Sequence, residues 1–554
     1  MRRLGIGGSL AAASMVAYLV VAGAVVLGAH SIIGDAWSRV GNAYYVLFSR
    51  DPHLAAIGFV WNPLPSLAVI PLLPLKLIWP DLVATGFAGS IVSAVCMASS
   101  VGVVYGIAVD WGVRRSLAIL VTVLFAADPM IVYYGANGMS EAMFILTMLL
   151  TVRYLARWSR DRSVGSLALA GVALSAAYLT RYEAAVAAVA SFAGVVVVST
   201  MRDRTQLREG LQEGIADGIV FLAPFGAAFV GWAVASWVIV GDPFEQFTSV
   251  YGVVSQLNVA QSSVAAFTGQ GTGAAYLWSG HQLLGLEPGI VLAGLLGLGA
   301  TVRGRHGLTI PAVAVLGSVV VWAVFGFLTG KTLGWLRYSI AEIPLVTVLA
   351  LAVLSRQPAA EERSTSSWLR LPLSAEHPFR RAGAFAPGLL MVLAVAAAVP
   401  VGFATMVDPS VNPSYGGEAW QLQPVLTGKT PVEVYTPDGQ YEAGRQAASY
   451  LDALHLARGK VLVDGAMGFP IILESNNPSQ FVTTPDRDFQ EVLLDPVSFG
   501  VEYLLVPEAV GYQSLDAINR AYPGIYAHGA AVATTLTAQF GAGGNNWRLY
   551  QVTP

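Results

Sequence analysis

Long apolar segments separated by short polar connections make up most of the chain. A helix that crosses the ~30 Å hydrocarbon core of a bilayer needs ~20 residues, and most of these segments approach that length. The segment at 64–79 is shorter and contains three prolines, so we expect it to dip into the membrane. About eleven spans then remain, and the pattern predicts a polytopic α-helical membrane protein. The apolar segments lie at 11–33, 64–79, 83–109, 116–134, 140–156, 166–180, 184–200, 217–240, 288–302, 308–328, 339–355 and 385–407.

Composition agrees with this class. Of the 554 residues, 55% are hydrophobic and only 12% are charged, whereas a soluble domain carries about 25% charged residues. The net charge of −3 gives no indication of a nucleic-acid partner. The one cysteine, Cys96, excludes an intrachain disulfide and a cysteine-built metal site.

Arginines on alternate connections predict the orientation of the spans. Basic residues are enriched in cytoplasmic loops, so Arg2 and Arg3 place the start of an uncleaved first span inside. We therefore expect a protein of the cell membrane whose C-terminal part is extracytoplasmic. The inside connections are 111–116, 153–162, 201–208, 303–306 and 356–381, and the outside ones are 31–82, 135–140, the turn at 181, 241–287 and 330–336.

The pattern changes at about residue 408. Short apolar segments at 460–465, 501–507 and 547–552 predict strands, while 442–454 predicts a helix before the first strand and 514–522 a helix before the last. Alternating strands and helices are typical of a small α/β domain. We therefore divide the chain into a membrane domain, 1–407, and an extracytoplasmic α/β domain, 408–554. The second has no glycine-rich phosphate loop and no metal-spaced His/Cys set, which favours a binding or covering role.

The outer segment 31–65 gathers charged and aromatic residues at one membrane face. Apolar positions from Trp37 to Phe48 have helical spacing, which predicts an amphipathic helix lying along the bilayer surface. Asp35, Arg39, His53 and Asn62 are the candidate site residues of this segment. The alternative is an unusually polar loop.

Further candidates lie at the outer ends of later spans. Glu141 opens a span, where an ionisable residue is a functional candidate and where helix capping is the alternative. Arg181, Tyr182 and Glu183 fill a turn between two spans, and a mutual ion pair of Arg181 with Glu183 is the alternative there.

Cations at the outer face break the positive-inside trend. Lys331, Arg337 and Tyr338 belong to one such connection, and a lipid phosphate would explain its two cations. His281 lies in the connection 241–287, which otherwise fits a solvated loop. Carboxylates beside cations suit group transfer from a lipid phosphate, because a carboxylate can deprotonate an acceptor hydroxyl while cations stabilise the departing phosphate.

The order of these motifs resembles the GT-C superfamily of polyprenyl-phosphate-sugar glycosyltransferases, which includes protein O-mannosyltransferases and the aminoarabinose transferase of lipid A. The resemblance covers roughly residues 1–355. Its motifs are the acid after the first span (Asp35), the "PPL"-like Asn62-Pro63-Leu64-Pro65, the stretch from Pro129 to Glu141, Leu179-Thr180-Arg181, and Arg337-Tyr338 with Pro344. The chain departs from the mannosyltransferase pattern by a lone Asp35 in place of an Asp-Glu pair, and by Asn62 where His or Lys often precedes the prolines.

The resemblance implies inverting transfer of a monosaccharide from a polyprenyl-phosphate donor to an extracytoplasmic glycan, lipid or protein. The catalytic residues would be Asp35, as general base, and Glu141, which would position the acceptor or hold a divalent ion. Arg181, Lys331, Arg337 and Tyr338 would bind the donor phosphate, and Arg39, His53, Asn62, Tyr182, Glu183 and His281 would bind substrate. The sequence leaves open whether the enzyme uses a divalent cation, Mg²⁺ or Mn²⁺; Asp35 and Glu141 would be its ligands. Two alternatives from other classes are a non-catalytic scaffold that binds envelope glycans and a transporter of lipid-linked sugars.

Overall fold

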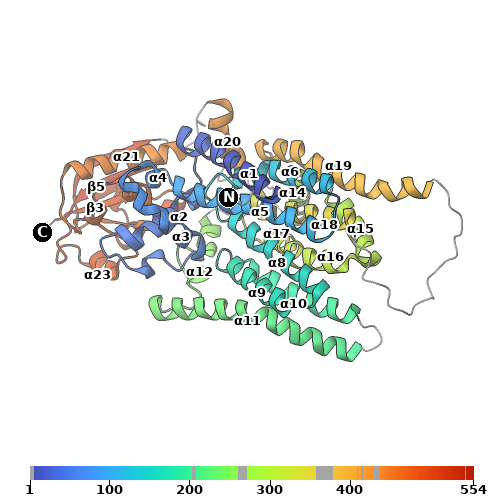
Figure 1. The fold of residues 1–554 in the computed structure, drawn as a ribbon. Coiled ribbons are helices and arrows are strands. Elements are labelled where there is room, and N and C mark those ends of the chain that lie inside the picture. Colours follow the sequence, from blue (N-terminus) through green and yellow to red (C-terminus); the bar gives the residue numbers. More distant parts are fainter. Residues whose placement is uncertain are drawn as a thin grey trace.

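The computed structural model describes residues 5–202, 207–259, 271–356, 379–408, 410–412, 417–428, 437–542 and 545–553. A large body of helices fills one side of the molecule and a small sheet with its own helices fills the other (Figure 1). The helices α2, α3 and α4 lie between the two (Figure 1).

Each predicted apolar segment falls on helical structure. The segment 64–79 forms the short α3 and the 3-10 segment η3, together Leu64–Leu77, which agrees with a dip. The helical part consists of α1 (Ile6–Ala22) with η1 (Gly23–Gly28), α2 (Gly34–Phe48), η2 (Leu54–Ile57), α3 (Leu64–Val69), η3 (Ile70–Leu77), α4 (Asp81–Ala84), α5 (Phe87–Asp110), α6 (Arg115–Ala127), α7 (Pro129–Tyr134), α8 (Glu141–Asp161), α9 (Val164–Tyr178), α10 (Ala184–Arg202), α11 (Leu207–Val240), α12 (Glu245–Thr248), α14 (Thr272–Leu286), α15 (Ile290–Ala300), η4 (Thr301–Arg305), α16 (His306–Ala312), η5 (Val313–Gly317), α17 (Ser318–Leu328), η6 (Leu336–Ser339), α18 (Glu342–Leu354) and α19 (Phe379–Val407).

Seven helical stretches among the described residues are long and apolar enough to cross a membrane. This supports a helical membrane protein, while the expected number of about eleven spans stays a prediction. Helix α14 was not predicted, because Thr, Gly and Gln interrupt its apolar positions. Parts of the predicted inside connections 201–208 and 356–381 lie outside the described residues.

The C-terminal part is built on a five-stranded sheet in the order β2-β1-β3-β5-β4. The strands β2, β1 and β3 are parallel, and β5 and β4 add an antiparallel hairpin. The predicted strands correspond to β1, β3 and β5, whereas the strands β2 and β4 were not predicted. The elements are α20 (Glu418–Thr427), α21 (Pro437–Ala453), β1 (Val461–Val463), α22 (Gly465–Glu474), η8 (Pro478–Gln480), β2 (Phe481–Val482), α23 (Phe489–Leu494), β3 (Tyr503–Pro507), η9 (Gly511–Leu515), α24 (Ala517–Ala521), α25 (Ile525–His528), β4 (Thr535–Ala542) and β5 (Asn545–Gln551).

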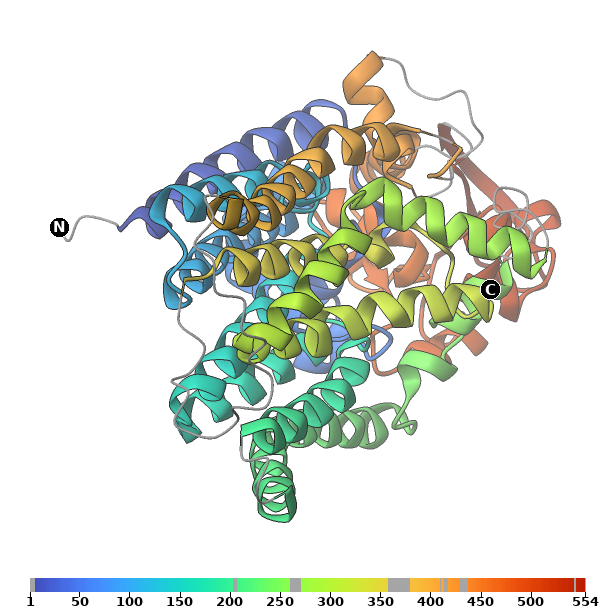
Figure 2. The ribbon, with the colours of Figure 1, turned by 90° about the vertical axis from the view of Figure 1, so that its right-hand side faces the viewer.

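Helix α2 is covered on more sides than its amphipathic pattern predicts. Its Trp37 packs edge-on against Phe469 of α22, with 5.7 Å between the ring centroids. Even Arg39, on the predicted polar face, is only 5% exposed. In Figure 2, seen from the helical side, the dark-blue α1 lies at the upper left and the red C-terminal elements lie at the right. The helix therefore lies inside the protein rather than on an open bilayer surface.

Candidate active site

The turn before α8 places a carboxylate in the interior. Gly138 has a φ of +80°, and a Cβ there would lie 3.3 Å from the backbone of Gly89 and Ser90, so only glycine fits this close approach. The Oδ1 atom of Asn137 accepts a hydrogen bond from the backbone N of Met139. Helix α8 then begins at Glu141, whose side chain is 1% exposed.

Arg181 neutralises this carboxylate. Its Nη1 atom lies 2.6 Å from Oε1 of Glu141, and its Nη2 atom lies 2.6 Å from Oε1 of Glu183. Burial alone would lower the pKa of Arg181, but the carboxylates of Glu183 and Glu141 outweigh burial and raise it. Arg181 is therefore a permanent cation, and the predicted pair with Glu183 is one half of a larger network.

Arg337 links this network to the first outer segment. Its Nη2 atom lies 2.9 Å from Oδ2 of Asp35, and its Nε atom lies 4.0 Å from Oε1 of Glu141. The guanidinium stacks over Trp335 at 4.2 Å. Within the described part of the chain, its Nε and Nη1 atoms are buried without a hydrogen-bond partner. A buried cation with two unused donors is suited to bind an anion.

Arg39 is a third buried guanidinium, one helical turn beyond Asp35 on α2. Its guanidinium lies over the ring of Trp61 at 4.3 Å. Burial lowers the pKa of Arg39 to about 10, although Asp35 and Glu141 act in the opposite direction. Its Nε and Nη1 atoms also find no hydrogen-bond partner among the described residues.

Two cavities flank the start of α8. The larger has a volume of about 440 Å³, including its open part, and Tyr182, Arg337 and Tyr338 lie in its wall beside Glu141 and Arg181. The smaller, of about 290 Å³, is mostly apolar and contains Arg39 and Ser140 in its wall. Each of the two cavities therefore has a buried guanidinium in its wall.

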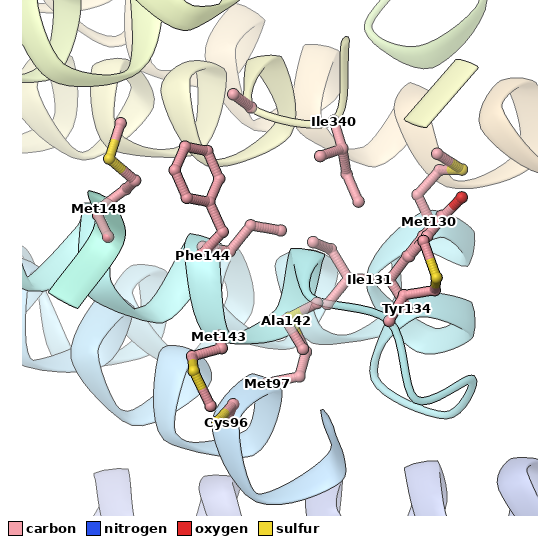
Figure 3. Close-up of a cluster of buried hydrophobic side chains, with 14 of the residues drawn as sticks. Cys96, Met97, Met130, Ile131, Tyr134, Ala142, Met143, Phe144, Met148 and Ile340 are labelled. Carbon is pink, nitrogen blue, oxygen red and sulfur yellow. The ribbon is translucent and has the colours of Figure 1, made fainter. Parts of the chain in front are cut away.

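A sulfur-rich apolar layer supports the start of α8. Figure 3 shows Met143 pointing toward Cys96 and Met97 on α5, while Phe144 points toward the opposite side of the helix. Ile340, just before α18, lies on that opposite side (Figure 3). All five side chains are at most 8% exposed, so the charged residues rest on a packed apolar support.

The structure brings together Asp35, Arg39, Glu141, Arg181, Tyr182, Glu183, Arg337 and Tyr338 of the predicted set. The remaining four lie elsewhere. Lys331 and His281 are exposed, and His281 is on α14. His53 contacts Asp51, with 2.6 Å between its Nδ1 atom and the backbone oxygen. Asn62 donates a hydrogen bond to the backbone oxygen of Tyr178, which fixes the start of α3.

The sequence analysis missed Glu418. This residue begins α20, is 1% exposed, and accepts a hydrogen bond from the hydroxyl of Tyr134. Burial raises the pKa of Glu418, and the nearby Arg337 acts against that shift. The only signal in the sequence is an acid next to Trp420 in a short amphipathic stretch, which is too weak to single out.

The residues of the network do not fit a metal ion. The described part of the chain contains no group of three or more His, Cys, Asp or Glu side chains with metal-binding geometry. Asp35 and Glu141 each contact a guanidinium, whose positive charge opposes a cation at the same oxygens.

The buried ion pairs of this helical membrane protein lie in turns and at the ends of its helices. Residues 82–227, which include Glu141 and Arg181, match the family model described as dolichyl-phosphate-mannose-protein mannosyltransferase. No curated protein matches the chain at a significant level.

One solved structure has a similar fold over nearly the whole chain, and a second is less similar. ArnT from Cupriavidus metallidurans bound to undecaprenyl phosphate has 14% sequence identity and a TM-score of 0.50, over 98% of this chain and 97% of that one. The archaeal oligosaccharyltransferase AglB from Archaeoglobus fulgidus, in complex with an inhibitory peptide and a dolichol-phosphate, has 12% identity and a TM-score of 0.36, over 90% and 69%. The resemblance to the GT-C superfamily is thereby confirmed, and the family model supports a glycosyltransferase.

Proposed function

We propose that this protein is a multi-pass enzyme of the cell membrane that transfers a monosaccharide from a polyprenyl-phosphate donor to an extracytoplasmic acceptor. The acceptor class is a glycan, lipid or protein of the cell envelope. One observation carries the proposal: the ion pair of Asp35 with the buried Arg337 lies beside the pair of Glu141 and Arg181, and both arginines line a cavity of about 440 Å³.

Asp35 acts as the general base in this proposal. One of its oxygens is held by Arg337, and its side chain is 29% exposed, so an acceptor hydroxyl can reach the carboxylate. Asp35 takes the hydroxyl proton while the acceptor oxygen forms a bond to the anomeric carbon. The bond from that carbon to the phosphate oxygen breaks, and the polyprenyl phosphate leaves with the electron pair. Attack opposite the leaving group gives inversion, as the resemblance implies.

Arg337 binds the phosphate and stabilises the charge that it gains. Two unused donors of this buried guanidinium support the assignment. Arg181 and Tyr338 complete the phosphate-binding group, and Lys331 contacts a phosphate that approaches from the exposed side. Glu141 holds both guanidiniums and the acceptor in place. Tyr182 and Tyr338 offer aromatic faces for the sugar.

The remaining substrate-binding residues differ in their distance from the ionic network. They are Arg39, Asn62, Glu183, His53 and His281. Arg39 and Glu183 belong to the ionic network, and Asn62 acts by fixing α3. His53 and His281 lie away from the network, so their role is limited to the far end of a large acceptor. No step of the proposal uses a metal ion, because the donor set described above does not fit one.

The test is transfer of labelled sugar in liposomes that contain the purified protein. A panel of polyprenyl-phosphate sugars is compared with the corresponding nucleotide sugars. We expect transfer from one or more lipid-linked donors and none from nucleotide sugars. A well-folded protein that uses no lipid-linked donor would contradict the proposal and favour a binding scaffold or a transporter.

A further inference from the structure

Asp464 stands where the C-terminal sheet meets the helical part. It follows β1 and caps α22, and its Oδ1 atom accepts a hydrogen bond from the backbone N of Ala466 at 2.8 Å. Its Oδ2 atom accepts from the backbone N of Ala517 and from the hydroxyl of Tyr251, both at 2.7 Å. The residue is 0% exposed. One buried carboxylate therefore joins α22, α24 and the segment that follows α12.

The hydrogen bond from Tyr251 connects Asp464 to the wall of the larger cavity. Tyr251 lies three residues beyond α12, and its backbone N contacts the hydroxyl of Ser249 at 3.3 Å. Phe247 of α12 packs edge-on against Tyr182, with 5.4 Å between the ring centroids. Tyr182 lines the larger cavity. The bond from Tyr251 to Asp464 thus fixes the short segment that supports one wall of the candidate site.

A second set of contacts connects the start of α22 to α2. The backbone oxygen of Gly465 accepts a hydrogen bond from the hydroxyl of Tyr45 at 2.8 Å. About one helical turn further along α22, Phe469 packs against Trp37. A Cβ at Gly41 would lie 3.1 Å from the Cβ of Phe469, so the two helices approach closely there. Helix α2 also carries Asp35, and α22 therefore fixes the helix on which the proposed base stands.

We propose that Asp464 and Gly465 form a positioning hub for sugar transfer: Asp464 holds the Tyr182 wall through Tyr251, and Gly465 holds the Asp35 helix through Tyr45. Neither hub residue lines either of the two cavities. The inference deepens the proposed function and rests on it for the activity measurements. Catalytic groups need placement within about 0.5 Å, so two hydrogen bonds made by adjacent residues at the start of α22 are an effective constraint.

Asp516 reinforces the hub from the side of α24. It is 0% exposed, caps α24 through Asn519, and has an Oδ2 atom with no hydrogen-bond partner in the described residues. Burial and the neighbouring Asp464 both raise the pKa of Asp516. Arg520 of the same helix lies over the Tyr251 ring at 5.6 Å. The hub therefore consists of two buried carboxyl groups and the phenol of Tyr251, with the exposed Arg520 at its edge.

Three Tyr→Phe variants test the hub, because each removes one hydroxyl and leaves the ring. Tyr45→Phe should lower kcat about 5- to 10-fold without changing the donor KM, since it loosens the Asp35 helix. Tyr251→Phe should raise the donor KM by a similar factor, since it loosens the Tyr182 wall. Tyr522→Phe is the control: its hydroxyl bonds the backbone oxygen of Leu493 within the C-terminal part, and both constants should stay unchanged.

Amide hydrogen exchange gives a readout that does not need activity. Tyr45→Phe should speed exchange in residues 34–48, and Tyr251→Phe should speed exchange in residues 245–259. Asp464→Ala is unsuitable as the main variant because α22 would lose its cap. Two results would overturn the hub. One is an unchanged rate of amide exchange in both Tyr45→Phe and Tyr251→Phe, and the other is a change in kcat or KM in Tyr522→Phe as large as in those two variants. Inactive wild-type protein with the expected exchange would contradict the proposed function and leave the hub standing.

Discussion

The Nη2 atom of Arg337 lies 2.9 Å from the Oδ2 atom of Asp35, although 302 residues separate the two in the chain. Asp35 lies in the first turn of α2, and Arg337 lies just before α18. The pair therefore ties the first outer segment to the last part of the membrane domain. It also orients one carboxylate oxygen and leaves a cation beside it for the leaving phosphate.

Arg337→Lys should lower kcat/KM for the lipid-linked donor by about 100-fold. Lysine keeps the charge but cannot contact Asp35 and a phosphate with one planar fork of donors. Steady-state kinetics in liposomes measure the effect, and Lys331→Gln is the control because Lys331 is exposed. An Arg337→Lys enzyme with wild-type kcat/KM would remove Arg337 from the phosphate site.

Glu141→Gln should destabilise the protein as well as inactivate it. The carboxylate lies near Arg181, Arg337 and Arg39, and its loss leaves three buried cations with less compensation. Removing one partner of a buried ion pair costs roughly 3–5 kcal/mol. Thermal unfolding in detergent checks this prediction. A variant as stable as the wild type would show that the guanidiniums are hydrated in the native protein.

Asp516→Asn should stabilise the C-terminal part at neutral and alkaline pH. Burial first, and Asp464 second, raise the pKa of Asp516 in the folded state above the unfolded value of about 3.9. The folded state thus binds the proton more tightly, so this contribution to stability is complete below about pH 4 and is lost as pH rises through the folded pKa. The amide keeps the N-cap and carries no charge.

The gain in Asp516→Asn should therefore grow with pH and reach about 1 kcal/mol or more at pH 8. Unfolding midpoints of the two proteins between pH 4 and pH 9 test this slope. Asp516 and Asp464 form a pair of buried carboxyl groups. The titratable groups that face this pair are Tyr251, Arg520 and, from α2, Tyr45. Parallel pH curves for the two proteins would show that Asp516 does not titrate in this range.

Arg50→Ala should loosen the contact between the first outer segment and the C-terminal part. Arg50 pairs with Asp486 at 2.9 Å and with Asp488, and the Asp486 side chain is only 1% exposed. An unpaired buried carboxylate should cost roughly 3 kcal/mol. The exposed pair of Arg445 and Glu442 supplies the control, because Arg445→Ala should cost less than 1 kcal/mol. Equal unfolding midpoints for the two variants would contradict this prediction.

Sequence patterns were sufficient to predict those helices and strands that depend mainly on their own local sequence. Apolar length located the helices of the bundle, and strand propensity located β1, β3 and β5. The outer ends of several spans share one membrane face, and this reasoning grouped Asp35, Glu141, Arg181 and Arg337. The structure brings these four side chains together.

Features that depend on distant partners were missed. Helix α2 looks amphipathic, yet α22 covers it from more than 400 residues away, as the bond between Tyr45 and Gly465 shows. Glu418 is buried only because Tyr134 and the bundle surround it. Strand β4 escaped prediction because a shift in register between Leu536 and Ala538 interrupts its alternation.

The central claim is that Asp35 is the base of a sugar transfer from a lipid phosphate. The most direct measurement compares single-turnover transfer by Asp35→Asn and by Asp51→Asn, which changes a carboxylate of the same outer segment that pairs with Arg487. Donor binding is measured alongside. We predict that Asp35→Asn binds donor but loses at least about 1,000-fold in transfer rate, while Asp51→Asn keeps most activity. Full transfer by a folded Asp35→Asn protein would contradict the account.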